Sequence, residues 1–497
     1  MDYISIFNTI GKLLKFMGLT TLVPMLVAII YQEAILPYIF LILVYEVLGF
    51  LLTIKKPVNA RIYSKEATVS IGLSWISISL LGALLYVFSG AIPNYTDAVF
   101  ELISGITTTG ATILPEVESL PKGILFYRNF TVWLGGIGIL VFLVALTSSE
   151  NTNGLNLYRA EAAGPNVQKM TNKLRDTALI TFFVYVSLTL IEVVCLLISG
   201  LSVFDAVTVS LTTAGTGGFT PTNLNIVSYN NFSAEIIITI FMLIFSINLG
   251  VYFFIVTRKF ISAFKNEELW TFLGIYIVAT LIITFNISPI YGGFFKSLRY
   301  STFEVASTIS DTGFANCDYN SWPALSHWLI LTLMMIGGCA GSTAGGMKVI
   351  RVIALFKSSK HKLHQTINPR KIMNVKIDGK IQDEKYLNGI YFYFYLFFMI
   401  LIVGTFLVSF DPSLSVQEAL FSACSAFNNS GPGLGITGPV GNYASLTIFS
   451  KWVLSALMLI GRLEIFPILI LFMPSVYRIK RHKKIKQQKI KKSTEFD

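Results

Sequence analysis

Four segments of the chain end in small hydroxyl or amide residues beside glycine, a combination that can replace the water shell of a cation. They read NYTDAVFELISGITTTGAT (94–112), SVFDAVTVSLTTAGTGGFT (202–220), SLRYSTFEVASTISDTGFA (297–315) and SVQEALFSACSAFNNSGPG (415–433). Aligned without gaps, they place Gly110, Gly218, Gly313 and Gly431 in one column. Because glycine adopts backbone angles that other residues resist, peptide carbonyls in these loops can face a shared axis. The predicted cation-binding residues are Thr107, Thr108, Thr109, Gly110, Gly215, Thr216, Gly217, Gly218, Ser310, Asp311, Thr312, Gly313, Asn428, Asn429, Ser430 and Gly431.

A short helix must position each of these loops. The predicted N-caps, sixteen residues before each glycine, are Asn94, Ser202, Ser297 and Ser415, and an acid follows three residues later in three copies, as Asp97, Asp205 and Glu418. This pattern matches a capping box and suits the positive end of a helix dipole. Each helix is roughly 17 Å long, too short to cross a membrane. We therefore expect four half-helices that enter the membrane and turn back.

The composition is that of a membrane protein. The 497 residues are 54% apolar and only 13% charged, with a mean hydropathy of +0.67. This excludes a soluble enzyme, a disordered scaffold and a nucleic-acid-binding module. Ten apolar segments are long enough, or nearly so, to cross a hydrocarbon layer about 30 Å thick. They lie at 16–31, 37–54, 67–90, 124–147, 177–200, 235–257, 269–288, 326–356, 389–410 and 446–473.

The net charge of +11 is distributed asymmetrically across these segments. With a cytoplasmic N-terminus, only five of the 38 Lys and Arg face outside, namely Lys122, Arg128, Lys296, Arg299 and Lys451, and Arg462 lies within a span. This positive-inside bias predicts a multi-pass protein with both termini in the cytoplasm. The basic tail, 476–497, is either an anchor on anionic lipid or a docking site for a partner.

The predicted fold is an all-α polytopic membrane protein in which span, half-helix, glycine loop and span repeat four times around a central pore. The negative ends of the half-helices point toward the bilayer centre and favour a cation there. The alternative is four unrelated interfacial segments. The expected units are an N-terminal pair of transmembrane helices (1–66), four repeats (67–149, 150–258, 259–388 and 389–475) and the tail (476–497).

In these motifs the chain resembles the Trk/Ktr/HKT superfamily of potassium transporters, and within it the TrkH branch. The motifs are TTTGAT (107–112), GTGGFT (215–220), SDTGF (310–314), NNSGPGLG (428–435), GGCAGSTAGGMKVIR (337–351) and GRLEIF (461–466). The resemblance implies that the column glycines belong to a selectivity filter, with potassium as the transported ion. It also implies a homodimer in the inner membrane of a prokaryote. No nucleotide is expected on this chain, because the family uses a separate cytoplasmic nucleotide-binding regulatory subunit of the TrkA type.

Two features depart from a symmetric filter. Asp311 places a carboxylate where a hydroxyl residue is the default, and it could either attract cations or face away. The fourth loop has the amides of Asn428 and Asn429 where the first has threonines. We therefore expect fewer well-defined ion sites than in a symmetric filter.

A gate is predicted in the second span of the third repeat. As one helix, 323–356 would be about 51 Å long, yet its middle holds five glycines in ten residues. Each costs about 1 kcal/mol in a helix interior, so the span is expected to break into two half-helices around a loop that blocks the pore when closed. The alternative is close helix packing through small residues. The predicted gating residues are Gly337, Gly338, Gly341, Ser342, Thr343, Gly345, Gly346 and Arg462.

Arg462 is the charged residue expected to assist this loop. An arginine within a span usually faces protein or water, and one that faces the ion path would repel cations until the loop moves. The alternative is a static salt bridge with Glu46 or Glu192.

The other function classes are weaker. No metal-binding, paired-carboxylate or nucleophile motif is present, so we expect no enzyme. The four cysteines show no paired spacing and predict neither a disulfide framework nor a metal site. An ion-coupled symporter, driven by protons or sodium, is the main alternative, because such transporters also contain broken helices. A purely structural subunit of a channel complex is the third possibility.

Overall fold

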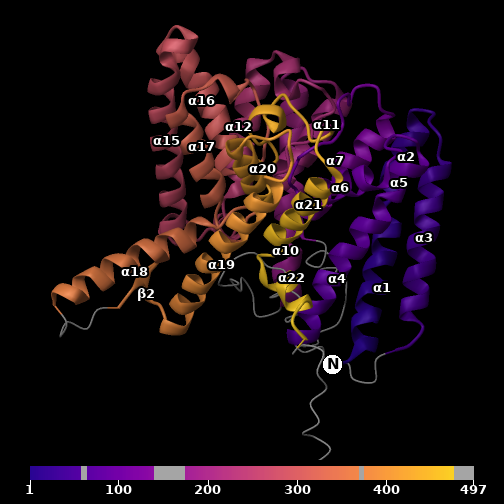
Figure 1. The fold of residues 1–497 in the computed structure, drawn as a ribbon, viewed down its shortest axis with the longest axis horizontal. Coiled ribbons are helices and arrows are strands. Elements are labelled where there is room, and N and C mark those ends of the chain that lie inside the picture. The colour runs from indigo at the N-terminus through magenta and orange to yellow at the C-terminus, as the bar shows by residue number, and fades with distance from the viewer. Residues whose placement is uncertain (57–63, 139–173, 369–373, 475–497) are drawn as a thin grey trace, which may run out of the picture.

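The computed structural model describes residues 1–56, 64–138, 174–368 and 374–474, and the part described is built from helices apart from one short antiparallel strand pair (Figure 1). The fold-class prediction of an all-α polytopic membrane protein is confirmed. The predicted tail 476–497, and the end of the span 124–147, lie outside the described residues.

The helices follow the predicted order. The N-terminal unit holds α1 (Tyr3–Thr20), α2 (Leu22–Ile30) and α3 (Leu36–Thr53). The first repeat holds α4 (Ser64–Gly82), α5 (Leu84–Phe88), α6 (Tyr95–Ile106) and α7 (Lys122–Ile137), and the second holds α10 (Leu174–Ile198), α11 (Val203–Gly215), α12 (Phe232–Ser246), α13 (Leu249–Val256) and α14 (Phe260–Phe264). The third holds α15 (Glu267–Tyr291), α16 (Phe294–Ile309), α17 (Ala324–Ile336) and α18 (Val349–Ile367), followed by β1 (Lys376–Ile377) and β2 (Lys380–Ile381). The fourth holds α19 (Glu384–Val408), α20 (Val416–Asn428), α21 (Ile448–Arg462) and α22 (Phe466–Leu471).

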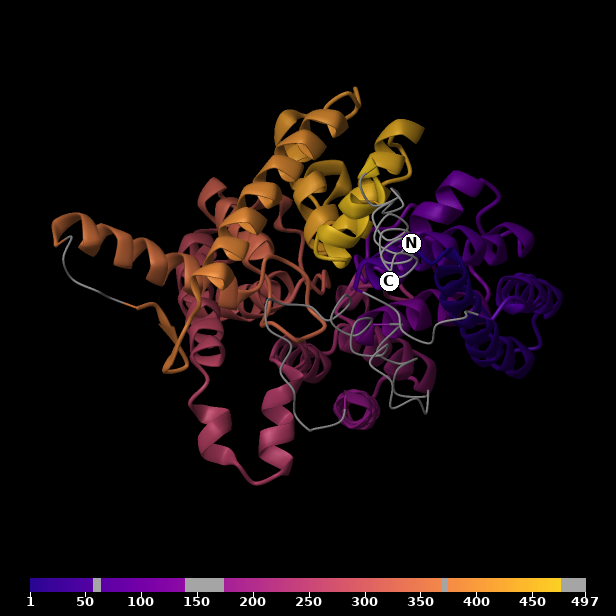
Figure 2. The same cartoon turned by 90° about the horizontal axis from the view of Figure 1, so that it is seen from below.

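Long apolar helices surround the molecule. Six helical segments of the described part are long and apolar enough to cross a membrane, or seven if the bent pair α12–α13 counts as one span. Large apolar side chains stay exposed along them, for example Leu43 and Phe50 on α3 and Ile402 and Phe406 on α19. A continuous exposed apolar surface of this kind fits lipid rather than water. The N-terminal helices α1 and α3 lie at one edge of the molecule, and α18 projects from the opposite edge (Figures 1 and 2).

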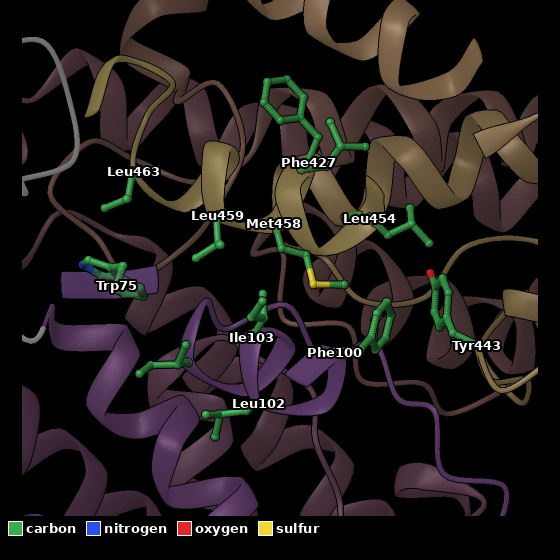
Figure 3. Packing of buried hydrophobic residues seen from close by; sticks show 14 of the residues in the cluster. Trp75, Phe100, Leu102, Ile103, Phe427, Tyr443, Leu454, Met458, Leu459 and Leu463 are labelled. Atoms are coloured by element: carbon green, nitrogen blue, oxygen red, sulfur yellow. The ribbon is translucent and has the colours of Figure 1, made fainter. Parts of the chain in front are cut away.

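The four repeats pack in a closed cycle. The second helix of each repeat contacts the half-helix of the next: α7 contacts α11, α12 contacts α16, α17 contacts α20, and α21 contacts α6. Figure 3 shows the closing contact, where Phe100 and Ile103 of α6 face Leu454 and Met458 of α21 in the apolar core. Four repeats that contact head to tail and close on themselves must enclose a common axis.

Three half-helices begin at the predicted caps. Asn94 Oδ1 accepts from the backbone N of Thr96 at 2.9 Å, and Ser202 Oγ accepts from that of Asp205 at 3.1 Å. Ser415 and Glu418 form a reciprocal capping box. These side chains satisfy amide groups that the first turn leaves without a helical partner.

The prediction that Ser297 caps the third half-helix is wrong. The helix α16 begins at Phe294 and has Gly293 as its N-cap, so Ser297 lies inside the helix and is fully buried. The reason is the short connection from α15, which ends at a left-handed Gly292 and leaves only Gly293 before the next helix. An earlier start removes the need for a polar cap three residues later.

The span that follows the glycine loop is interrupted in more repeats than the sequence predicts. The 326–356 span is interrupted between Ile336 and Val349, as expected. The 235–257 and 446–473 spans, predicted as continuous, are also interrupted. The helices α12 and α13 meet at 94°, where Asn248 caps the new helix, and α22 begins with Pro467 in its first turn. Proline fits the first turn of a helix and disrupts its interior, so it favours a new start at this point.

Candidate cation pathway

The four glycine loops, 107–110, 215–218, 310–313 and 428–431, meet in a ring. A Cβ built on Gly110 would lie less than 3.0 Å from the carbonyl oxygen of Gly217 in the second loop. The three other column glycines are equally close to a carbonyl oxygen of the next loop. A Cβ on Gly218 would meet the oxygen of Thr312 in the third loop, one on Gly313 that of Ser430 in the fourth, and one on Gly431 that of Thr109 in the first. Each glycine therefore leaves room for a neighbouring carbonyl, and the contacts close after four steps.

The backbone conformation repeats in all four loops. Thr108, Thr216, Asp311 and Asn429 have φ of 57°, 54°, 53° and 59°. The column glycines, two residues further on, have φ of 83°, 61°, 80° and 98°. In every loop the amide between them returns to the last turn of the half-helix, for example from Thr109 to the carbonyl of Ser104 at 2.8 Å. This is the Schellman ending of a helix, so one local motif builds each loop.

The hydroxyl side chains are mostly engaged within the loops. Thr107 Oγ1 and Thr109 Oγ1 are 2.8 Å apart, and Ser310 Oγ and Thr312 Oγ1 are 2.6 Å apart. Asn429 Nδ2 donates to Thr109 Oγ1 at 3.0 Å, which joins the fourth loop to the first. A hydroxyl oxygen in one hydrogen bond keeps lone pairs, so both the hydroxyls and the peptide carbonyls of the sixteen predicted residues stay candidates for holding a cation.

Two cavities lie on opposite sides of the ring. The cavity on the side of residues 111–117, called the outer cavity here, has a volume of about 80 Å³ and is lined by the four column glycines and by Arg128. The cavity on the opposite side, called the inner cavity, has a volume of about 100 Å³ and is lined by Asn429, Arg462 and the loop residues 341–346. The glycine loops therefore separate the two cavities.

The 337–348 loop follows α17 and closes on itself. Gly337, Gly341 and Gly346 have φ of 69°, 71° and 72°, a conformation that favours glycine. At the neck of the loop, the backbone N of Met347 donates to the carbonyl of Met335 at 3.0 Å, and that of Lys348 donates to the carbonyl of Ile336 at 2.9 Å. The loop is thus a hairpin inserted between two helices, as its clustered glycines predicted.

This loop lies directly against the ring. The backbone N of Gly346 donates to the carbonyl of Asn428 at 3.1 Å, and Gly345 leaves no room for a Cβ beside the same oxygen. On its far side, the amide of Leu249 donates to the carbonyl of Gly341 at 3.1 Å, at the break between α12 and α13. The loop therefore bridges the fourth glycine loop and the second repeat below the ring.

Asp311 faces this loop. Its side chain is fully buried, and neither carboxylate oxygen has a hydrogen-bond partner among the described residues. A Cβ on Gly337 would lie 2.9 Å from Asp311 Oδ2, and one on Gly346 would lie 3.1 Å from it. The structure therefore places this carboxylate at the junction of ring and loop.

Arg462 joins the loop to the ring. Its Nη1 donates to the carbonyl of Thr343 at 3.0 Å and lies 3.2 Å from Thr108 Oγ1. Its Nη2 donates to the carbonyls of Gly135 and Gly136, at the end of α7. These bonds hold a positive charge directly under the ring. Glu464, two residues away, forms an ion pair with Arg351.

Several functional candidates are not among the residues predicted from the sequence. Glu268, in the first turn of α15, is buried, and its Oε1 accepts from the amides of Ala340 at 2.7 Å and Ile350 at 3.1 Å. One carboxylate thus links the 337–348 loop, at Ala340, to the first turn of α18, at Ile350. Lys348 and Arg351 are also buried beside the loop. An acid at the start of an apolar span is the one signal that pointed to Glu268.

Comparison with known proteins agrees with this architecture. A sequence profile of the TrkH family, described as cation transport protein, matches residues 31–479. The Trk system potassium uptake protein TrkH of Salmonella typhimurium is 33% identical over 490 residues, which cover 96% of this chain and 100% of that protein. TrkG of Escherichia coli K12, also named a Trk system potassium uptake protein, is 32% identical over 479 residues, 93% of this chain and 96% of TrkG. The crystal structure of the potassium transporter TrkH from Vibrio parahaemolyticus superposes with a TM-score of 0.86 at 29% identity, covering 96% of this chain and 100% of that one.

Proposed function

This chain belongs to the TrkH family of cation transport proteins, and we propose that it takes up potassium across the cytoplasmic membrane through a gated, channel-like pore. Its relatives are named potassium uptake proteins, and the proposal extends that activity to this chain. The observation that carries it is the ring of four glycine loops, in which each column glycine accommodates a carbonyl oxygen of the next loop.

The ring supports selection of a dehydrated cation by peptide oxygens. Its carbonyls come from four half-helices that begin outside, so their negative ends point toward the ring. Potassium has a weakly held water shell that carbonyl rings can replace. We propose that potassium enters from the outer cavity, sheds water at Gly110, Gly218, Gly313 and Gly431, and leaves into the inner cavity.

The gate in this proposal is the 337–348 loop together with Arg462. The loop contacts the ring through Gly346 and the carbonyl of Asn428, and Arg462 is hydrogen-bonded to Thr343 of the loop. With the loop in place, the path below the ring is occupied by backbone and by a positive charge. Opening requires the loop to leave, which breaks the bond from Arg462 to the Thr343 carbonyl and the bond from the Ala340 amide to Glu268.

The assembly belongs to the same proposal. We infer a homodimer in the inner membrane of a prokaryote, with both termini in the cytoplasm. A separate cytoplasmic nucleotide-binding subunit of the TrkA type would act on the loop from the cytoplasmic side. Lipid would contact the exposed apolar faces of α3, α15 and α19.

The test is potassium and rubidium uptake by cells that lack their own uptake systems, with Gly110→Ser and Gly313→Ser as variants. Wild-type protein should restore growth at low potassium, and both variants should lose preference for potassium over sodium. Wild-type protein that reaches the membrane but leaves growth unchanged would refute the proposal.

Flux through purified protein in liposomes distinguishes the pore from an ion-coupled symporter. Unitary currents without a second ion support the gated pore. Fixed stoichiometric coupling to protons or sodium would instead support symport.

A further inference from the structure

A buried ion pair lies between the first two glycine loops, beside the outer cavity. Arg128 of α7 and Glu101 of α6 are both almost fully buried, and Arg128 Nε is 2.6 Å from Glu101 Oε1. Charged side chains at such depth are rare, and each normally has a specific set of partners. The gate described above does not involve either residue.

Glu101 holds the segment that follows the first loop. Its carboxylate accepts from the Thr112 hydroxyl at 3.0 and 3.1 Å and from the backbone N of Ile113 at 2.9 Å. These residues come directly after Gly110 and Ala111. One carboxylate on the first half-helix therefore binds the segment that follows its glycine loop.

Arg128 holds the segment that follows the second loop. Its Nη1 donates to the carbonyl of Thr220 at 3.1 Å, and its guanidinium lies 3.4 Å from the centre of the Phe219 ring. Phe219 directly follows Gly218 and packs on the first half-helix at Gly105, where a Cβ would lie 3.4 Å from the ring. The planar guanidinium suits both contacts, because it can stack on a ring while it donates at its edge. One ion pair thus joins the outer ends of two neighbouring loops.

The other loops are held differently. In the third repeat, Glu304 occupies the aligned position of Glu101 and accepts from the backbone N of Asn316 at 2.9 Å, twelve residues on, as Glu101 does from Ile113. Asn316 and Cys317 supply its donors in place of an arginine. In the fourth repeat, Ser422 and Thr437 hydroxyls are 2.8 Å apart. The arginine is therefore a feature of the junction between the first and second repeats.

The position of Arg128 also has an electrostatic consequence. Arg128 lines the outer cavity with the four column glycines, where an uncompensated positive charge would repel an entering cation. Glu101, in direct contact with it, cancels that charge locally.

We propose that the Arg128–Glu101 pair determines specificity at the outer end of the ring. Arg128 and Glu101 are positioning residues: they fix the spacing of the first two loops, and Glu101 neutralises Arg128 at the cavity where the cation enters. This inference rests on the proposed potassium transport. It predicts that discrimination against sodium depends on the pair, while control by the 337–348 loop does not.

The experiment uses the full-length protein in cells without their own potassium uptake and, after purification, in liposomes. Glu101→Gln keeps the side-chain shape and leaves Arg128 uncompensated. It should raise the apparent KM for potassium about tenfold and lower the potassium-to-sodium ratio. Arg128→Lys keeps the charge but loses the planar guanidinium that stacks on Phe219 and donates to the Thr220 carbonyl. The potassium-to-sodium ratio should therefore fall about tenfold with little change in KM. The double variant Glu101→Gln/Arg128→Met should recover the KM while its ratio stays low.

Glu235→Gln is the matched control. It breaks another ion pair between repeats, Arg299 Nη2 to Glu235 Oε1 at 2.6 Å, which joins α16 and α12, and it should leave the ratio unchanged. Thermal unfolding of the purified proteins identifies variants that fail to fold. If Glu101→Gln does not fold, Arg128→Lys and the double variant decide the question.

Wild-type KM and ion ratio in folded Arg128→Lys and in the folded double variant would overturn the inference while leaving the proposed function intact. Absence of potassium transport by the wild-type protein would refute the proposed function itself. A ratio that falls equally in Glu235→Gln would show that any broken pair suffices, and would also overturn the inference.

Discussion

The glycine-loop ring and the 337–348 loop lie in contact, yet they are built in opposite ways. The ring is made of backbone, and each of its four loops repeats one helix ending, one left-handed residue and one glycine. The 337–348 loop comes from the third repeat alone. Besides backbone bonds at its neck and to neighbouring segments, it is held by two side chains, Arg462 and Glu268. The ring is nearly symmetric, and the loop breaks that symmetry.

This difference corresponds to two mechanical requirements. A ring that replaces the water around an ion needs equivalent oxygens at fixed spacing, and repeated backbone motifs in close contact provide them. A gate must leave its closed position at a modest cost in free energy. A few hydrogen bonds to individual side chains, each contributing about 1 to 3 kcal/mol, meet that requirement. The ring should therefore fail when its packing is disturbed, and the loop should open when one tether is removed.

Gly218→Ala should give the largest effect, because it breaks the ring itself. Its Cβ would lie less than 3.0 Å from the carbonyl oxygen of Thr312. Overpacking of this kind costs about 1 to 3 kcal/mol, so potassium uptake should fall about 100-fold. Rubidium-86 uptake into cells measures it.

Gly90→Ala is the control for backbone strain. Gly90 has a similar positive φ, 74°, but nothing lies within 4 Å of its built Cβ. Uptake by this variant should stay near that of the wild-type protein. Equal losses in the two variants would show that strain, rather than the carbonyl contact, explains the Gly218 result.

Arg462→Ala should have the next largest effect, in the opposite direction. The change removes the bond to the Thr343 carbonyl and the positive charge under the ring. Basal potassium flux in liposomes without any regulatory subunit should rise about tenfold. Arg462→Lys, which keeps the charge, should rise less. Unchanged flux in Arg462→Ala, with and without the subunit, would exclude its gating role.

Glu268→Ala should loosen the same loop from its other side. The loss of one acceptor for the amides of Ala340 and Ile350 should raise basal flux about fivefold without changing the potassium-to-sodium ratio. Glu267→Ala is the neighbouring control, since Glu267 pairs with Lys357 at the surface and should matter little. A changed ion ratio in Glu268→Ala would mean that ring and loop are not separable.

Asp311→Thr should give the smallest effect and sharpen the boundary between the two regions. The change gives the third loop a threonine at the position that is threonine in the first two loops, Thr108 and Thr216. Removing a buried carboxylate whose oxygens have no hydrogen-bond partner among the described residues should stabilise the closed loop and lower uptake about twofold, with the ion ratio unchanged. Competition between rubidium and sodium measures that ratio. A large fall in it would assign Asp311 to the filter instead.

Local patterns in the sequence determined the half-helices and the glycine loops. The side chains of Asn94, Ser202 and Ser415 accept hydrogen bonds from backbone amides two or three residues further along the chain. A positive φ in a loop favours glycine at that same position. Such interactions can be predicted because both partners are close in the chain. Ser297 was mispredicted because the turn before it, at Gly292 and Gly293, already starts the helix. The break before Val349 was predictable from clustered glycine, whereas the break at Asn248 was not.

Tertiary structure alone decided what surrounds the ring. Glu101 meets Arg128 from 27 residues away, Glu268 reaches Ala340 across 72 residues, and Arg351 finds Glu464 across 113. Each of these charges, seen in the sequence, is an isolated ionisable residue near an apolar segment. Its partner is set by how the repeats pack around the axis, and no local spacing encodes that packing. The sequence by itself therefore determined the parts that repeat, and the fold decided the asymmetric contacts that hold and gate them.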